Sequence, residues 1–302
     1  MTYFPGGDIT TADYNTFATL ANSMNEIYAD LHPGAPSLPI AGYGYGQSPA
    51  LTPVSSSDNI TAAKWAALFD TMRKSGSHQG ITTVPPLPAL NPVADSTIIS
   101  YAGLATLLST LGTNRFSIAP GQSALTAVSE AQPSATPWLN SLTYTCSMTF
   151  ASWDNARYFF NAGGYLSIAG TYSPVATPDD ASWSSALTTM GIQKLLYNSS
   201  TGTNPAVGFY GLSTTPIVIY LGYAGGGMYY SGNTISISAH LNNAPGLATS
   251  IIFTIVLTDN DPSISKPVKN GSTIFTMSNL CAAGANVSVA PPTATAISFL
   301  SA

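Results

Sequence analysis

The spacing of the hydrophobic residues changes near Phe116, and this change limits the possible folds more than any other feature. Before it, apolar residues recur every three or four positions, as in residues 17–27, which places them along one side of a helix. After it, apolar residues alternate with hydroxyl residues, as in residues 142–150, which is typical of a strand with one buried face. The sequence therefore predicts an α+β protein. It has a small helical N-terminal region over residues 1–112 and an antiparallel β-sandwich domain over residues 113–302.

The N-terminal region is expected to contain amphipathic helices joined by loops rich in proline and glycine. They cover residues 8–31, a segment from Asp58 to about Gly76, and residues 96–111. The loop Gly42–Gln47 between the first two lacks the spacing of a phosphate-binding loop. Its two tyrosines are expected to pack on the helical region, with a partner protein as the alternative.

Several segments after residue 113 have the alternating or continuously apolar pattern of strands. Ser250–Leu257 is apolar on both faces, which suits a central buried strand. A short helix is expected from Asp179 to the residue before Gly191. Strands of this spacing, separated by Gly, Asn and Pro turns, favour a β-sandwich. The other expected strands are residues 142–150, 208–223, 234–241, 272–277 and 286–289.

The segment Arg157–Leu166 joins an aromatic run to an Asn-Ala-Gly-Gly turn, and we expect it at the centre of the β-sandwich domain. The aromatic residues 158–160 favour an extended backbone, so the simplest prediction is a strand, a tight turn and a second strand. At least one of Gly163 and Gly164 is expected to have a positive φ. Packing is the favoured role of this turn, and contact with a neighbouring subunit is the alternative.

The composition excludes several classes of partner. Only 7% of the 302 residues are charged, against about 25% in an ordinary soluble domain. A surface with so few charges predicts that part of it is covered in an assembly. The net charge is −5 and the basic residues are scattered, so nucleic-acid binding is not expected. The most apolar window, Ile251–Leu257, is shorter than the roughly 20 residues of a membrane span, and no secretory signal is expected at the N-terminus.

The carboxylates do not form an obvious catalytic pair. Glu26 and Glu130 are the only glutamates, the first on a helix and the second in a loop, so no glycosidase site is expected. Asp259 and Asp261 could hold calcium in a carboxylate-rich turn. The segment lacks the later glutamate of a calcium loop, so a turn that ends a buried strand is the favoured interpretation.

The cysteines and histidines also lack the spacing of a reactive site. Cys146 and Cys281 cannot form a zinc site or a disulfide framework and are expected to be reduced thiols, with Cys146 a small buried hydrophobe. His32, His78 and His240 have no metal-ligand spacing. Solvated or locally hydrogen-bonded side chains are expected at all three. The sequence therefore predicts no catalytic, cofactor-binding or metal-binding residues.

The order of several motifs resembles a family of uncharacterised virion structural proteins of tailed bacteriophages, described as tail-fibre-like. Phe159-Phe160-Asn161-Ala162-Gly163-Gly164 is the most specific of them. Ala66 departs from the pattern, because an Asn is expected there, as Asn15 follows Tyr14. The other motifs are Tyr14-Asn15, Gly42-Tyr43-Gly44-Tyr45-Gly46-Gln47, Ile60-Thr61, Trp65, His78-Gln79, Asn114-Arg115, Ala156-Arg157-Tyr158 and Trp183 before Gly191.

The resemblance implies a non-enzymatic building block of the virion, assembled in the host cytoplasm. Its expected place is the tail, neck, collar or fibre, where it would contact other virion proteins and form a homo-oligomer, a trimer or a hexamer. Two alternatives remain open at this point. One is a capsid decoration protein, and the other is a receptor-binding or polysaccharide-binding tail protein.

Overall fold

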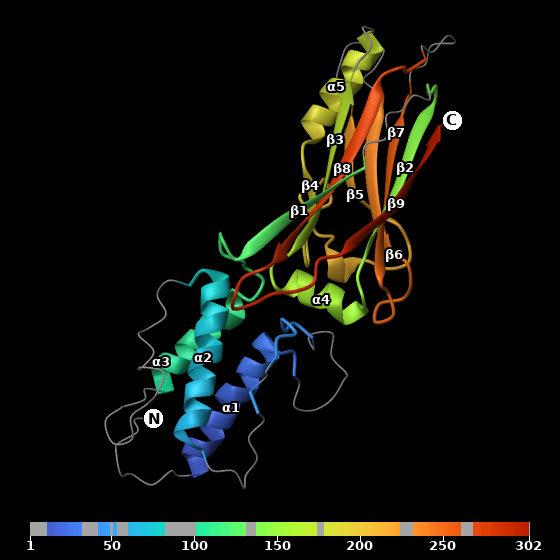
Figure 1. Ribbon diagram of the computed structural model, residues 1–302. Helices are drawn as coiled ribbons and strands as arrows, with labels where there is room; N and C mark the ends of the chain where they lie inside the picture. The colour runs from blue at the N-terminus through green and yellow to red at the C-terminus, as the bar shows by residue number, and fades with distance from the viewer. Residues whose placement is uncertain are drawn as a thin grey trace. The chain divides into compact units, whose positions relative to one another are not determined.

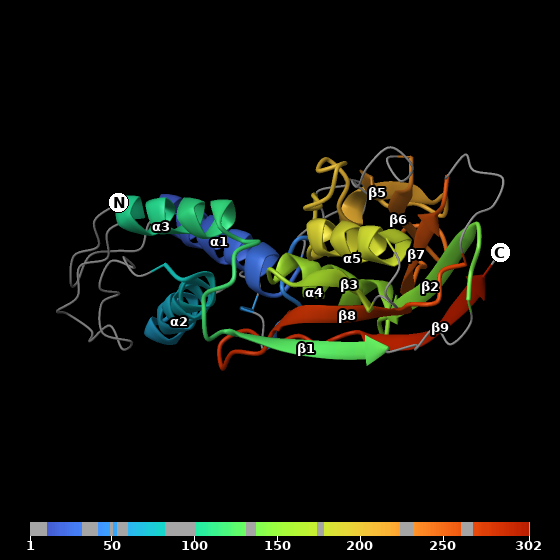
Figure 2. The same cartoon turned by 90° about the horizontal axis from the view of Figure 1, so that it is seen from above.

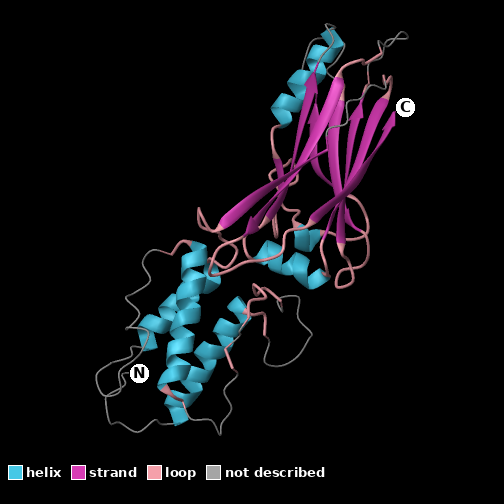
Figure 3. Cartoon of the chain, viewed as in Figure 1, coloured by secondary structure: helices cyan, strands magenta, loops and turns pink. Residues whose placement is uncertain are grey.

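The computed structural model describes most of the chain as helices and antiparallel strands. The described residues are 11–31, 42–48, 51–52, 60–81, 101–130, 137–173, 178–223, 232–260 and 268–301. Helices dominate the first part of the described chain and strands the second, so the predicted α+β class is confirmed (Figures 1 and 3).

Over the described residues, the helices expected near the N-terminus are present as α1 (Thr11–Tyr28), α2 (Ala62–Gln79) and α3 (Tyr101–Thr113). The first residues of the three predictions, 8–10, 58–59 and 96–100, lie outside the described part of the chain. The Thr61 side chain caps α2 by accepting a hydrogen bond from the Lys64 amide, as Thr caps generally do. This helix ends about one turn later than expected. The apolar stripes of the three helices share one core, formed by Phe17, Leu20, Met24, Ile27, Leu68, Phe69, Met72, Leu104, Leu107 and Leu111.

The strands form two antiparallel sheets that face one another. The four-stranded sheet has the order β1-β8-β3-β4 and the five-stranded sheet has the order β5-β6-β7-β2-β9. Tyr144 of β2 packs on Phe275 of β8, with ring centroids 4.7 Å apart, so the core lies between the sheets. The strands are β1 (Ser123–Glu130), β2 (Ser141–Thr149), β3 (Tyr165–Ser173), β4 (Gln193–Leu195), β5 (Ile217–Tyr223), β6 (Thr234–Leu241), β7 (Ser250–Thr258), β8 (Ser272–Ala282) and β9 (Thr293–Ser301).

Most of the predicted strands are confirmed, with differences at their ends. The segment expected as a strand over 208–223 begins with the 3-10 helix η1 (Phe209–Gly211) and is extended only in β5. Residues 286–289 contribute only the isolated bridge Ala283↔Ser288. β7 is central in its sheet, as expected, but it is buried on one face only, so the expectation of two buried faces was wrong. β1 and β9 were not predicted.

The expected helix after residue 178 is confirmed as α5 (Pro178–Met190), which packs against β3. Figure 2 shows α5 lying beside the four-stranded sheet that contains β3. Gly191 ends the helix with a φ of +60°.

The prediction of a strand before the Asn-Ala-Gly-Gly turn was wrong, because the aromatic run is the helix α4 (Trp153–Asn161). The Ser152 hydroxyl accepts a hydrogen bond from the Asn155 amide at 3.1 Å and donates one to the Asn155 side chain at 2.7 Å. The bond from the Asn155 amide to the Ser152 hydroxyl is that of a serine N-cap, and the second bond holds the two side chains together. Gly163, with a φ of +81°, ends the helix, so the expected positive φ is confirmed and a strand follows only after it.

Contacts within the chain divide it into two compact units. The helical unit consists of Met1–Ala124, Arg157–Gly163 and Cys281–Ala290. The sandwich unit consists of Leu125–Ala156, Gly164–Leu280 and Pro291–Ala302. The aromatic-glycine motif, which we expected in the β-sandwich domain, therefore belongs to the helical unit as far as Gly163. A boundary at residue 112 misses the two later segments that complete this unit.

Candidate functional site

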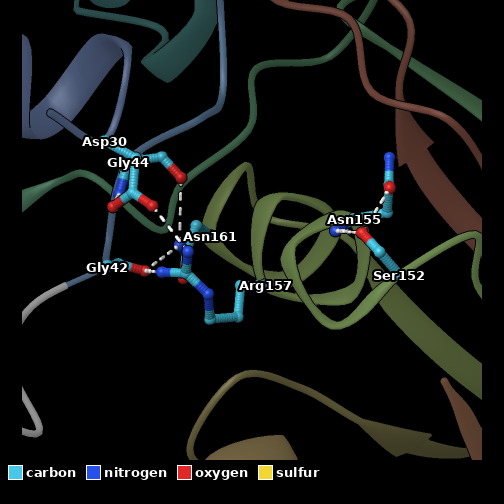
Figure 4. Close-up of polar contacts among 7 residues, drawn as sticks. All are labelled: Asp30, Gly42, Gly44, Ser152, Asn155, Arg157 and Asn161. Carbon is cyan, nitrogen blue, oxygen red and sulfur yellow. Dashed lines mark hydrogen bonds and ion pairs between the residues drawn. The ribbon is translucent and has the colours of Figure 1, made fainter. Parts of the chain in front are cut away.

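A cluster of polar groups in the helical unit joins the last turns of α4 to the loop 42–48 and to the end of α1. We call it the Arg157 cluster; its members are Asp30, Gly42, Gly44, Arg157 and Asn161 (Figure 4). Arg157 and Asn161 lie four residues apart, so both project from the same side of α4.

The Arg157 guanidinium makes two contacts in this cluster. It donates to the Gly42 carbonyl at 2.6 Å and pairs with an Asp30 carboxylate oxygen at 2.7 Å. The side chains of Arg157 and Asp30 are only 14% and 5% exposed, so the pair is nearly removed from water. Asn161 donates to the carbonyls of Gly42 and Gly44 at 2.8 and 3.0 Å. These four contacts thus help to satisfy the Gly42 and Gly44 carbonyls and the Asp30 carboxylate.

Asp30 and Gly44 fit together so closely that the loop tolerates no side chain at position 44. A Cβ on Gly44 would lie 2.2 Å from the Asp30 amide nitrogen. Asp30 has a φ of +74°, a region that costs most residues roughly 1–2 kcal/mol but that Asp adopts more readily. The Gly44 amide donates to the second Asp30 carboxylate oxygen at 3.1 Å. The cluster therefore orders this loop, and each polar group in it binds another part of the same chain.

A second buried network surrounds Tyr45, whose ring is fully enclosed in the helical unit. Its hydroxyl donates to the Arg115 carbonyl at 2.7 Å and accepts from the Gln79 side chain at 2.8 Å. The His78 ring meets the Tyr45 ring edge to face, with centroids 5.1 Å apart, and its Nε2 lies 3.1 Å from the Ala162 carbonyl. Tyr45 thus packs on the helical region, which confirms the favoured prediction for this loop.

His78 is therefore neither solvated nor bonded to its neighbours in sequence, and that part of the prediction was wrong. Burial lowers the pKa of His78 from its ordinary value to about 4, although the bond to Ala162 acts in the opposite direction. Burial also raises the pKa of the Tyr45 phenol. Both groups are therefore neutral at pH 7, where they take part in packing and hydrogen bonding. His240 lies half-buried on the outer face of β6, as expected, and His32 lies outside the described residues.

A third buried group, in the sandwich unit, involves the aspartate that was considered as a calcium ligand. The Asp259 carboxylate pairs with the Lys269 ammonium, and both side chains are essentially inaccessible to solvent. The ammonium also donates to the Leu139 carbonyl and lies 5.4 Å from the Trp138 ring centroid. The cation that balances Asp259 is therefore a lysine, which supports the interpretation of this segment as a turn. Asp261 lies outside the described residues.

Both cysteines are free thiols, and Cys146 is buried as predicted; Cys281 is also buried, which was not predicted. Burial raises the pKa of Cys281 to about 11, which leaves almost no thiolate at neutral pH. Within the described residues, no group of three or more His, Cys, Asp or Glu side chains is placed to hold a metal ion. None of the helices in the described ranges has the length and apolar character needed to cross a bilayer.

Sequence reasoning missed the Arg157 cluster altogether. Asp30 and Arg157 are separated by 127 residues, so no local pattern connects them. The helical state of α4 did have a signal, namely the cap formed by Ser152 and Asn155 together with Gly163 after the last turn. With a helix there, the four-residue spacing of Arg157 and Asn161 would have placed both on one face.

Comparisons with known protein families, curated proteins and solved structures found no match to this chain. The Arg157 cluster, the Tyr45 network and the Asp259–Lys269 pair are therefore interpreted from their own geometry. In all three, the hydrogen bonds described above join groups of the same unit. In the Tyr45 network, His78 Nδ1 and Gln79 Oε1 are buried without a hydrogen-bond partner among the described residues.

Proposed function

We propose that the chain is a non-enzymatic structural component of a tailed bacteriophage virion that acts through contacts with other proteins. Its place in the particle is the tail, the neck and collar, or the fibre assembly. The resemblance of its motifs to virion structural proteins supports the assignment to a tailed bacteriophage particle. Features of the structure support the other part of the proposal, a non-enzymatic role as a building block.

The observation that carries this role is the use of the buried polar groups. The Arg157 cluster orders a loop, the Tyr45 network joins α2 to the segment after α3, and Lys269 neutralises Asp259. A catalytic acid or base faces its substrate and has a pKa suited to proton transfer. In these three groups the polar side chains instead hold parts of the chain together.

The exposed apolar side chains support contacts with proteins. Among the described residues, Leu247 and Leu300 are 70% and 68% exposed, and Tyr223 is 64% exposed. They occur on a surface with few charged residues, where they add to the apolar area available to a partner.

Mass spectrometry of purified particles tests the proposal. The chain should be a stoichiometric component, with a copy number that is a small multiple of three or six relative to the portal and tail proteins. A copy number that scales with the capsomers would instead identify a capsid decoration protein. Absence of the chain from particles that retain full infectivity would contradict any structural role in the virion.

A further inference from the structure

The face of the five-stranded sheet that points away from the four-stranded sheet carries hydroxyl groups and no charged residue. We call it the outer face. On β2, β6 and β7 every second side chain is half-buried and lies on this face, while its neighbours fill the core. These outer side chains are all Ser or Thr, except for His240, Ile252 and Val256.

Apolar side chains lie at both edges of the outer face. β5 and β9 are the edge strands, with β6, β7 and β2 between them (Figure 2). Leu221 of β5 is opposite Ser236, and Leu300 of β9 is opposite Thr143, so both leucines share the outer face with these hydroxyl residues. Leu221 is 39% exposed and Leu300 is 68% exposed.

The strand register places these residues in one row across the sheet. The row runs Leu221, Ser236, Val256, Thr143, Leu300. It has the same kind of residue at each end, a hydroxyl residue next to each end, and Val256 on the central strand. The row is therefore chemically similar in either direction.

We propose that the outer face packs against the outer face of a second copy of this chain, about a two-fold axis parallel to β7. Such an axis exchanges the two edges of the sheet, so Leu221 meets Leu300 of the second copy and Val256 meets its own equivalent. Ser236 then lies opposite Thr143 of the second copy. A two-fold interface requires a patch that complements itself, and this row meets that requirement.

The chemistry of the face favours a second copy over a partner of opposite charge. A charged face would repel its own copy, whereas this face has no Asp, Glu, Lys or Arg on β2, β6 or β7. Hydroxyl groups both donate and accept hydrogen bonds, so two such faces can pair without a different complementary group. The occupant that matches this face is thus another uncharged sheet of the same kind.

The size of the face is sufficient for a specific contact. Five strands about 4.8 Å apart and about eight residues long, at about 3.3 Å per residue, cover roughly 600 Å². Two such faces together bury about 1,200 Å², which is the lower end of the range for specific interfaces. The expected assembly is a dimer, or a hexamer if a three-fold contact is also present.

Sedimentation velocity of the full chain over a range of concentrations tests the proposal. The wild type should associate reversibly, and Leu221→Lys should raise the dissociation constant at least about tenfold, because it places an unpaired charge in the contact. Ile192→Lys is the matched control. Ile192 is also exposed, but it lies just before β4 of the other sheet, and its substitution should leave association unchanged.

A second substitution tests the two-fold axis itself. Leu221 and Leu300 lie four strands apart, about 19 Å, so they cannot pair within one copy. Leu221→Lys combined with Leu300→Glu should restore association, because each lysine then meets a glutamate of the second copy. Leu221→Lys combined with Leu300→Lys should not restore it. Circular dichroism checks that each variant is folded.

A cysteine variant decides the outcome if the charged variants do not fold. Leu221→Cys with Leu300→Cys should give disulfide-linked dimers on oxidation, and Ile192→Cys should not. The proposal is overturned if the wild type stays monomeric, if Leu221→Lys behaves like the Ile192 control, or if the lysine–glutamate variant is not restored. This interface rests on the proposed function, because it gives the surface and the partner through which the chain would act in the virion. The two proposals fail separately, because a monomeric wild type would not change the result of mass spectrometry on the particles.

Discussion

Arg157→Met should destabilise the helical unit by about 3 kcal/mol. The substitution keeps most of the aliphatic volume but removes the guanidinium that pairs with Asp30 and binds the Gly42 carbonyl. The Asp30 carboxylate, only 5% exposed, would retain the Gly44 amide as a donor but lose its balancing charge. Breaking a buried ion pair from one side typically costs about 3–5 kcal/mol, and the slight exposure of Arg157 favours the lower value.

Urea unfolding followed by far-UV circular dichroism measures this loss, since the helices dominate that signal. At about 2 kcal/mol per molar urea, a loss of 3 kcal/mol lowers the midpoint by about 1.5 M. Arg73→Met is the matched control, because Arg73 pairs with Asp70 on the surface of α2, with side chains 44% and 33% exposed. Such a surface pair contributes less than about 1 kcal/mol. Equal midpoints for the two variants would refute the structural role that we assign to the Arg157 cluster.

Three further predictions concern single positions. Gly163→Ala should cost more stability than Gly191→Ala in thermal melts, because both positions have positive φ but only Gly163 would bring a Cβ within 3.0 Å of neighbouring atoms. The pKa of His78 is about 4 in the folded chain and near 6.5 in the unfolded chain. The stability that the neutral His78 side chain gives to the folded state is therefore fully present above pH 6.5. It is lost towards pH 4, by up to about 3 kcal/mol, and His78→Gln should flatten this part of the stability–pH curve. Lys269→Met should destabilise the sandwich unit by about 3–5 kcal/mol, and Asp259→Leu in the same chain should recover most of this in calorimetry.

Segments with strong local periodicity were predictable from the sequence. β6 has the expected bounds, Thr234–Leu241, because its apolar residues alternate without interruption. The apolar stripe of α2 is likewise buried as expected from its spacing. In both cases the local pattern and the tertiary packing favour the same conformation.

α4 was misassigned because intrinsic preference and local capping favour different structures. Its aromatic run has a strand preference, but the cap at Ser152 and the left-handed Gly163 define a helix, and burial of Phe159 and Phe160 stabilises it. Preferences of single residues are weak compared with packing.

The candidate site could not be predicted, because it is formed by residues that are far apart in the sequence and close together in space. Arg157 meets Asp30, and His78 meets the Ala162 carbonyl, across 127 and 84 residues. No periodicity encodes such pairs. On the outer face of the five-stranded sheet, the hydroxyl side chains of residues 142–150 were visible in the sequence. Residues 250–257 were expected to be apolar on both faces, and the order of the strands came only from the structure.

A cryo-electron microscopy map of the intact particle tests the central claim most directly. The account predicts density that fits the helical and sandwich units at symmetry-related positions in the tail, neck or fibre, in contact with other virion proteins. A complete map in which these regions are fully built from other chains, with no density for this one, would contradict it.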